Sequence, residues 1–272
     1  MSPSVDRKQT RTFGKVSVNL TTRTGGVQRR TPAPYLRRAA AAEWEALWST
    51  VCGRLAGKRL GAVPLALTAT SLVLLFDLVQ QLPGGVGLVE RVGVVRGSQP
   101  LELSLLRTPL SLFVPALDLP VWGALAQVLV VFGIAEIVLG RRQTLCIAYA
   151  GTLAGTLYAR LAVDLGPDSL FGLPASAALV RDSGPSAAVV ALAICTAWRA
   201  RAWCTGAAVA VVMAAEAAML PNLAGLEHLA AVATAVLTAA VGELFGGYWP
   251  RVLALVRASA DTARPTAGAL TP

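Results

Sequence analysis

The chain has 272 residues, of which 55% are hydrophobic and 14% are charged, and its mean hydropathy is +0.60. Soluble domains carry about 25% charged residues, so the composition excludes an ordinary soluble enzyme and indicates an integral membrane protein. The net charge of +9 comes from residues 1–59, which hold twelve Lys and Arg against three Asp and Glu.

Residues 1–42 form a basic arm rich in Thr, Arg, Gly and Pro, without helical or strand periodicity. We expect this arm to be disordered and cytoplasmic, and to act as a topogenic signal that contacts anionic lipid headgroups. Binding to nucleic acid is disfavoured because the arm has no interleaved aromatic residues. Between Ala39 and Lys58, apolar residues recur every three to four positions, which predicts an amphipathic interfacial helix over residues 43–59.

Six apolar segments approach or reach the ~20 residues that cross a membrane as a helix. They are Leu60–Leu82, Val121–Leu139, Gln143–Ala162, Gly184–Trp198, Trp203–Leu220 and His228–Phe245. Residues 83–120 are predicted to form an ordered external or half-inserted loop, and residues 247–272 a cytoplasmic tail. The sequence therefore predicts an all-α, six-helix membrane domain over residues 60–246.

The charges between these segments predict their orientation. Arginines 141, 142, 199, 201, 251 and 257 fall on the side of the basic arm, and acidic residues 164, 168, 182 and 227 fall on the other. The positive-inside pattern then places both termini of a multi-pass cell-membrane protein in the cytoplasm. In this orientation the fourth and sixth spans both begin at the outer surface, so Ser186 and His228 lie at the same depth.

Several residues inside the spans are assigned structural roles. Gly151-x-x-x-Gly155 predicts the close approach of another helix. Glu136 is expected to be structural because it lies beside the arginines at 141 and 142, and Glu216 is placed where it can reach an outer cavity.

The four cysteines, at positions 52, 146, 195 and 204, lack ligand spacing. They are predicted to be buried thiols, neither disulfides nor metal ligands. We expect no metal and no cofactor.

Ser186 and His228 are the candidate catalytic pair. Peptide hydrolysis needs a nucleophile, a base that takes its proton, and donors for the oxyanion. Ser186 begins an apolar helix, whose free backbone N–H groups favour negative charge, and His228, the only histidine, opens another. Two simpler explanations stay open, a helix N-cap for Ser186 and a hydrogen-bonded structural role for His228.

Three motifs resemble the rhomboid family of intramembrane proteases. Residues 184–187 (Gly-Pro-Ser-Ala) resemble the Gly-x-Ser-Gly motif at the start of the family's fourth helix. Residues 228–235 are similar to His-x-x-Gly-x-x-x-Gly on the sixth helix, with Ala231 and Ala235 at the glycine positions. Arg107 and residues 131–140 resemble the loop arginine and the second helix, which ends in Glu-x-x-Leu-Gly.

The resemblance covers residues 60–246 and implies an intramembrane serine endopeptidase. Ser186 is then the nucleophile and His228 its general base, without a third carboxylate. Its substrates are transmembrane segments of other proteins, which enter from the bilayer between the second and fifth spans.

The sequence departs from the family motifs at the oxyanion site. The family's His-x-x-x-Asn falls at Pro120 and Ala124, which have no side-chain donor, and Gln127 is the candidate substitute. Ala187 replaces a glycine, and Val190 stands where the family often has a tyrosine under the histidine. Gly184, Ala187, Gln127 and Val190 are therefore the candidate oxyanion or site-lining residues. These departures keep a second class open, a non-catalytic rhomboid-like protein that binds transmembrane helices of client proteins.

Overall fold

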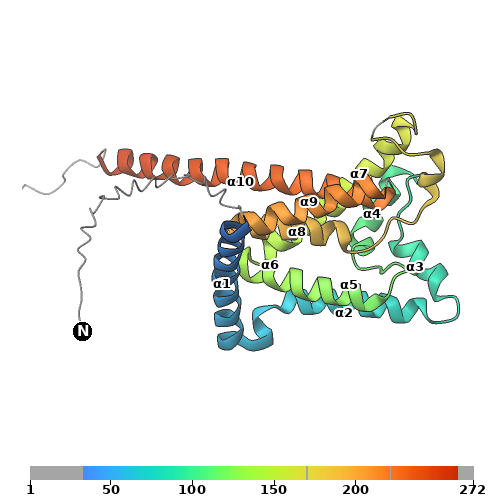
Figure 1. Ribbon diagram of the computed structural model, residues 1–272, viewed down its shortest axis with the longest axis horizontal. Helices are drawn as coiled ribbons and strands as arrows, with labels where there is room; N and C mark the ends of the chain where they lie inside the picture. The colour runs from blue at the N-terminus through green and yellow to red at the C-terminus, as the bar shows by residue number, and fades with distance from the viewer. Residues whose placement is uncertain (1–32, 170, 221, 263–272) are drawn as a thin grey trace, which may run out of the picture.

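The computed structural model describes residues 33–169, 171–220 and 222–262 (Figure 1). Most of the predicted basic arm, residues 1–32, and the last ten residues of the predicted tail lie outside these ranges. Every named element in the described ranges is a helix, and the single β pairing there is an isolated bridge between Val95 and Asp182. The prediction of an all-α protein is confirmed for this part of the chain.

The described residues include three helices that are long and apolar enough to cross a membrane. These are Val121–Val138, Arg141–Leu165 and Leu223–Glu243, and the bent pair Ala40–Ala62 and Pro64–Gln80 makes a fourth candidate. Two further apolar helices, α8 (Ser186–Arg199) and α9 (Trp203–Met219), are shorter. Their 14 and 17 residues give lengths of about 21 and 26 Å, less than the ~30 Å of a bilayer's hydrocarbon core.

The first two helices meet at a sharp bend. Helix α1 (Ala33–Lys58) leads through a 3₁₀ turn, η1 (Arg59–Ala62), into α2 (Pro64–Gln80), and the bend measures 55°. Pro64 explains the break, because proline lacks the N–H that would continue the preceding helix. Helix α1 starts before the predicted Ala39, so residues 33–42 of the predicted arm are helical.

Helix α1 is docked on the bundle through its Glu43 side chain. The carboxylate accepts hydrogen bonds from the backbone N–H groups of Cys204 and Thr205, at 2.9 and 3.2 Å. These N–H groups belong to the first turn of α9, so Glu43 caps that helix from outside. Trp44 and Trp48 are exposed on this helix, and their position at a membrane interface stays a prediction.

The long connection between α2 and α5 is ordered by two arginines. It contains α3 (Gly85–Gly93) and α4 (Leu101–Ser111). Arg107 donates to the carbonyl oxygen of Val94 at 3.2 Å, and Arg160 of α7 donates to the carbonyl oxygen of Gln99 at 2.6 Å. The prediction of an ordered loop is confirmed.

The second predicted span is one interrupted helix. It consists of α5 (Val121–Gln127), the π-helical turn η2 (Val128–Phe132) and α6 (Gly133–Val138). At its end, buried Glu136 accepts hydrogen bonds from Nε of Arg141 at 2.9 Å and from the backbone N–H of Ala66 at 3.0 Å. Glu136 thus ties α6 to α2 and to the next helix, which agrees with its predicted structural role.

Helices α7 (Arg141–Leu165), α8 and α10 pack on one another and form the centre of the bundle. A Cβ atom on Gly151 would lie 2.6 Å from the Cβ of Ala191 in α8, and one on Gly155 would lie 3.3 Å from the Cβ of Glu227 in α10. The distance at Gly151 is too short for a side chain, and the distance at Gly155 is tight, so the two glycines permit the close approach that the sequence predicted.

Helix α10 (Leu223–Thr262) differs most from prediction. It begins five residues before His228, so the expected opening of a helix at His228 is wrong. The side-chain oxygen of Asn222 accepts a hydrogen bond from the N–H of Gly225 at 2.9 Å and so caps an earlier start. The helix also continues past Phe245 into the predicted tail, and its 40 residues measure about 60 Å. Its second half projects past α1 in Figure 1.

The four cysteines are free thiols with different exposure. Cys195 is buried, Cys52 and Cys204 are half-buried, and Cys146 is exposed. The prediction of burial is therefore wrong for Cys146, which lies near the start of α7.

Candidate functional site

A cavity of about 870 Å³ lies at the end of the bundle where α8 begins. Helices α5, α7, α8, α9 and α10 contribute to its wall, together with the segment that precedes α8. Ser186 of α8 and His228 of α10 both line it, as do the predicted site residues Gly184, Ala187 and Gln127. The packing of α8 on α10 thus brings the two candidate catalytic residues to one space.

Ser186 is the first residue of α8. Gly184 reaches a φ of +122°, a conformation that favours glycine, and its N–H donates to the carbonyl oxygen of Ser111 at 3.0 Å. The first bond at this end of α8 runs from the N–H of Val189 to the carbonyl oxygen of Pro185, at 2.8 Å. The N–H groups of residues 186–188 therefore have no acceptor within the helix. No side-chain cap is formed at this helix start, so the N-cap explanation for Ser186 is not supported.

His228 is only 9% exposed, and its two ring nitrogens differ. Nδ1 lies 2.9 Å from Oε2 of Glu216 in α9, whereas Nε2 is buried without a hydrogen-bond partner. A carboxylate only accepts hydrogen bonds, so the proton between them belongs to Nδ1. In the neutral ring Nε2 then carries a free lone pair, as a general base requires.

Glu216 departs from the dyad that the resemblance implies, because it places a carboxylate behind the histidine. The sequence put Glu216 within reach of an outer cavity, and the structure places it on the cavity wall. Its pairing with His228 was missed, since it depends on the rotation of α9 against α10, which no sequence motif specifies.

The cavity wall carries no side-chain donor at the two positions that the family pattern predicts. Pro120 and Ala124, which occupy these positions, both line the cavity. Gln127 lines the same wall and is the side-chain amide that α5 presents there. The π-helical turn η2 follows Gln127 directly, and such turns often occur at functional sites.

The two substituted positions on α8 lie differently. Ala187 lines the cavity, and its methyl group would lie in ordinary van der Waals contact, at 3.7 Å, with a Cβ on Gly155. Val190 is not on the cavity wall. It is buried one turn deeper against Ala231 and Ala235 of α10, so its prediction as a site-lining residue is wrong.

Two further carboxylates, those of Asp182 and Glu227, line the cavity. From the sequence they were predicted only as charges on the outer side of the membrane. Asp182 accepts a hydrogen bond from the hydroxyl of Thr156 at 2.8 Å, and its backbone pairs with Val95. Burial raises the pKa of the Asp182 carboxyl to about 6, although the bond from Thr156 opposes this. Oε1 of Glu227, next to His228, is buried without a partner.

Comparison of the chain with protein families, with curated proteins and with solved structures found no match.

Proposed function

We propose that the chain is an intramembrane serine protease of rhomboid type, with Ser186 as nucleophile and His228 as general base. The observation that carries the proposal is that both residues line one cavity. Nε2 of His228 is bonded neither to Ser186 nor to any other described group, so it is free to accept the hydroxyl proton once the two residues approach. The proposal includes a bundle of six membrane spans. Four are the three long helices and the bent pair, and the shorter helices α8 and α9 are the other two.

The length of α8 supports a site below the membrane surface. A helix of about 21 Å leaves part of a ~30 Å hydrocarbon core unfilled. The cavity occupies the end of the helix at which Ser186 lies and gives water a path to the hydroxyl. Hydrolysis within a membrane needs such a path, because water is the second reactant.

The proposed reaction uses groups on the cavity wall. Nε2 of His228 takes the proton of the Ser186 hydroxyl as Oγ of Ser186 attacks the scissile carbonyl carbon. Glu216 stabilises the imidazolium that results. The backbone N–H groups at the start of α8, with the amide of Gln127, stabilise the oxyanion. The imidazolium then protonates the leaving amine, and a water molecule hydrolyses the acyl-enzyme by the same steps.

Helix α9 supports the proposed lateral path for a transmembrane substrate. Among its described residues only Ala217 is buried, whereas α8 is buried over most of its length. A helix that contributes so little to the core separates from its neighbours at a small cost. α9 packs on α8, α10 and α1, and its displacement from α8 and α10 would open the cavity towards the bilayer.

One observation favours a second function, a non-catalytic protein that binds client transmembrane helices. Pro120 and Ala124 occupy the cavity wall, where neither provides a side-chain donor. Loss of one oxyanion donor costs about 10²–10³ in rate in serine proteases. A cavity that retained Ser186 and His228 without sufficient oxyanion stabilisation would still hold a helix.

Reaction with a fluorophosphonate probe separates the two functions. The detergent-purified protein is compared with the variants Ser186→Ala, His228→Ala and Ser183→Ala. Ser183 is a suitable control because it lines the same cavity. Labelling that needs Ser186 and His228 but not Ser183 supports the protease. Absence of labelling in the folded wild-type protein would favour the helix-binding function.

A further inference from the structure

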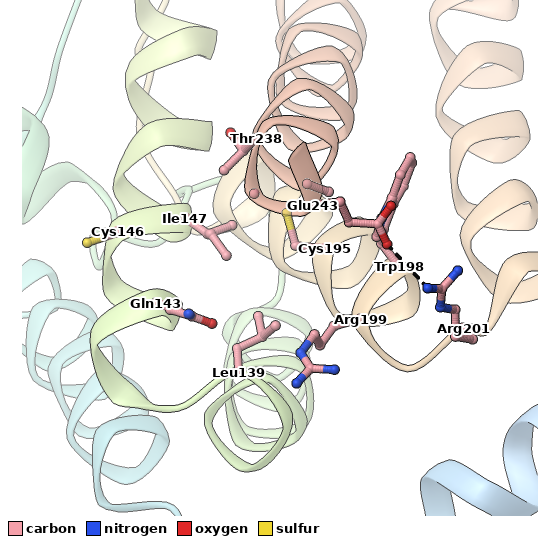
Figure 2. A pocket seen from close by; sticks show the side chains of 12 residues that line it. Leu139, Gln143, Cys146, Ile147, Cys195, Trp198, Arg199, Arg201, Thr238 and Glu243 are labelled. Atoms are coloured by element: carbon pink, nitrogen blue, oxygen red, sulfur yellow. Dashed lines mark ion pairs between the residues drawn. The ribbon is translucent and has the colours of Figure 1, made fainter. Parts of the chain in front are cut away.

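A second cavity, of about 720 Å³, lies at the other end of α8 (Figure 2). It is bounded by the end of α6, the start of α7, the last turns of α8 and the middle of α10. Its wall is mainly apolar and includes Leu139, Ile147, Cys195 and Ala239. The volume lies within the ~300–1,000 Å³ of typical ligand sites.

Two guanidinium groups lie at this cavity. Arg199 and Arg201 both line it, and Figure 2 shows the Arg199 side chain between Leu139 and the last turn of α8. Arg199 forms no ion pair with any residue whose side chain the structure describes. Arg201 lies 3.6 Å from Glu243, but these side chains are 71% and 49% exposed, so their pairing is weak.

A buried donor adds to this polar edge. The indole N–H of Trp198, which also lines the cavity, is buried without a hydrogen-bond partner. An apolar chamber with two cations at one edge matches an amphiphile with an acyl chain and an anionic headgroup. Basic pockets between membrane helices bind such headgroups.

We propose that this cavity binds an anionic phospholipid, with one acyl chain between α7, α8 and α10 and the phosphate on Arg199 and Arg201. The charge complementarity of the cavity edge identifies the occupant, because a zwitterionic lipid gains less from two guanidinium groups. The proposal does not depend on the protease function, since the cavity lies at the opposite end of α8 from Ser186.

The test is native mass spectrometry of the full-length protein, delipidated in a neutral detergent. It is titrated with palmitoyl-oleoyl phosphatidylglycerol and, separately, with the matching phosphatidylcholine. We expect one phosphatidylglycerol to bind at least tenfold more tightly. Arg199→Gln should weaken that binding by about 10–100-fold, as expected for a lost charge-assisted hydrogen bond.

Two matched variants distinguish a site from general attraction to a basic surface. Arg142→Gln removes an exposed charge near the start of α7, outside the cavity wall, and should leave the affinity within about twofold. Gly242→Leu should block the acyl chain while both arginines remain, because Gly242 lines the cavity and a Cβ there meets nothing within 4 Å.

Three results would overturn the proposal. They are equal affinity for the two lipids, equal losses in Arg199→Gln and Arg142→Gln, and undiminished binding in Gly242→Leu. Displacement of the lipid by an equal concentration of inorganic phosphate would show a free-phosphate site instead. Gly242→Leu keeps the test decisive if Arg199→Gln does not fold.

Discussion

Nδ1 of His228 in α10 lies 2.9 Å from Oε2 of Glu216 in α9. The contact joins two helices at the wall of the cavity that Ser186 lines, and it determines which ring nitrogen is free. Because the carboxylate holds a proton on Nδ1, the lone pair of Nε2 remains available within the cavity that Ser186 lines. In the proposed protease, this carboxylate would take the place of the acid in a Ser-His-acid triad.

Replacement of Glu216 by Gln should reduce fluorophosphonate labelling by about 10²–10⁴, because an amide donor favours the wrong imidazole tautomer. Glu216→Asp should retain more labelling than Glu216→Gln, since it keeps the acceptor on a shorter side chain. The initial labelling rates of the three proteins measure both effects.

Nitrogen NMR of the histidine distinguishes orientation from a general structural role. With one histidine in the chain, its ¹⁵N shifts report which nitrogen carries the proton. We expect a protonated Nδ1 in the wild type and a mixture in Glu216→Gln. If the tautomer and the labelling rate are the same in Glu216→Gln and in the wild type, Glu216 does not orient His228. The tautomer comparison is decisive even if the wild type is not labelled.

Gln127 is expected to replace the missing oxyanion donors. Gln127→Ala should lower the labelling rate by about 10–10³, because one donor of the oxyanion site is lost. Gln143→Ala is the matched control, since Gln143 lines the second cavity at the other end of α7. Equal labelling of Gln127→Ala and wild type would assign oxyanion stabilisation to the backbone N–H groups of α8 alone.

Gly151 should be essential for the packing of α7 on α8. In Gly151→Ala the new methyl group would meet Ala191 at 2.6 Å, and overpacking of this kind costs about 1–3 kcal/mol. The thermal midpoint in detergent should fall. Gly123→Ala is the control, because a Cβ at Gly123 has nothing within 4 Å and should leave the midpoint unchanged or raise it.

Apolar periodicity was sufficient to predict α7, α8, α9 and the span from Val121 to Val138, because each is bounded by charges, proline or glycine. It misplaced the start of α10, because residues 221–227, which include Pro, Asn and Gly, resemble a turn in composition, whereas the helix begins at Leu223 under the Asn222 cap. The topology argument placed Ser186 and His228 at one depth, and the structure places both on one cavity.

The partners of the site residues were beyond sequence reasoning. Glu216 pairs with His228, whereas Val190 points away from the cavity. Both results depend on how α8, α9 and α10 are rotated about their axes relative to one another. Rotation depends on side-chain packing along whole interfaces, such as that between Gly151 and Ala191. Spacing along one helix indicates which residues share a face, but not which neighbour meets that face.

Asp182 should make stability depend on pH. Burial raises the pKa of this carboxyl to about 6 from an ordinary value of 3.8, so between these values the folded protein holds a proton that the unfolded chain has released. The stabilising contribution is complete below about pH 4 and is lost as pH rises to about 6. Above this range Asp182 is charged, half-buried, and close enough to Glu227 for the carboxylates to repel each other.

Asp182→Asn isolates this contribution, because the amide stays neutral and its oxygen still accepts the hydrogen bond from Thr156. As the pH rises from 4 to 7, the thermal midpoint in detergent should fall further in the wild type than in Asp182→Asn. The difference should be a few °C, because each kcal/mol of stability shifts the midpoint by about 2–4 °C. Asp164→Asn, at an exposed position near the end of α7, is the matched control and should follow the wild type. Parallel curves for the wild type and Asp182→Asn would show that Asp182 is ionised throughout this range, and the cavity would then carry its charge at every pH tested.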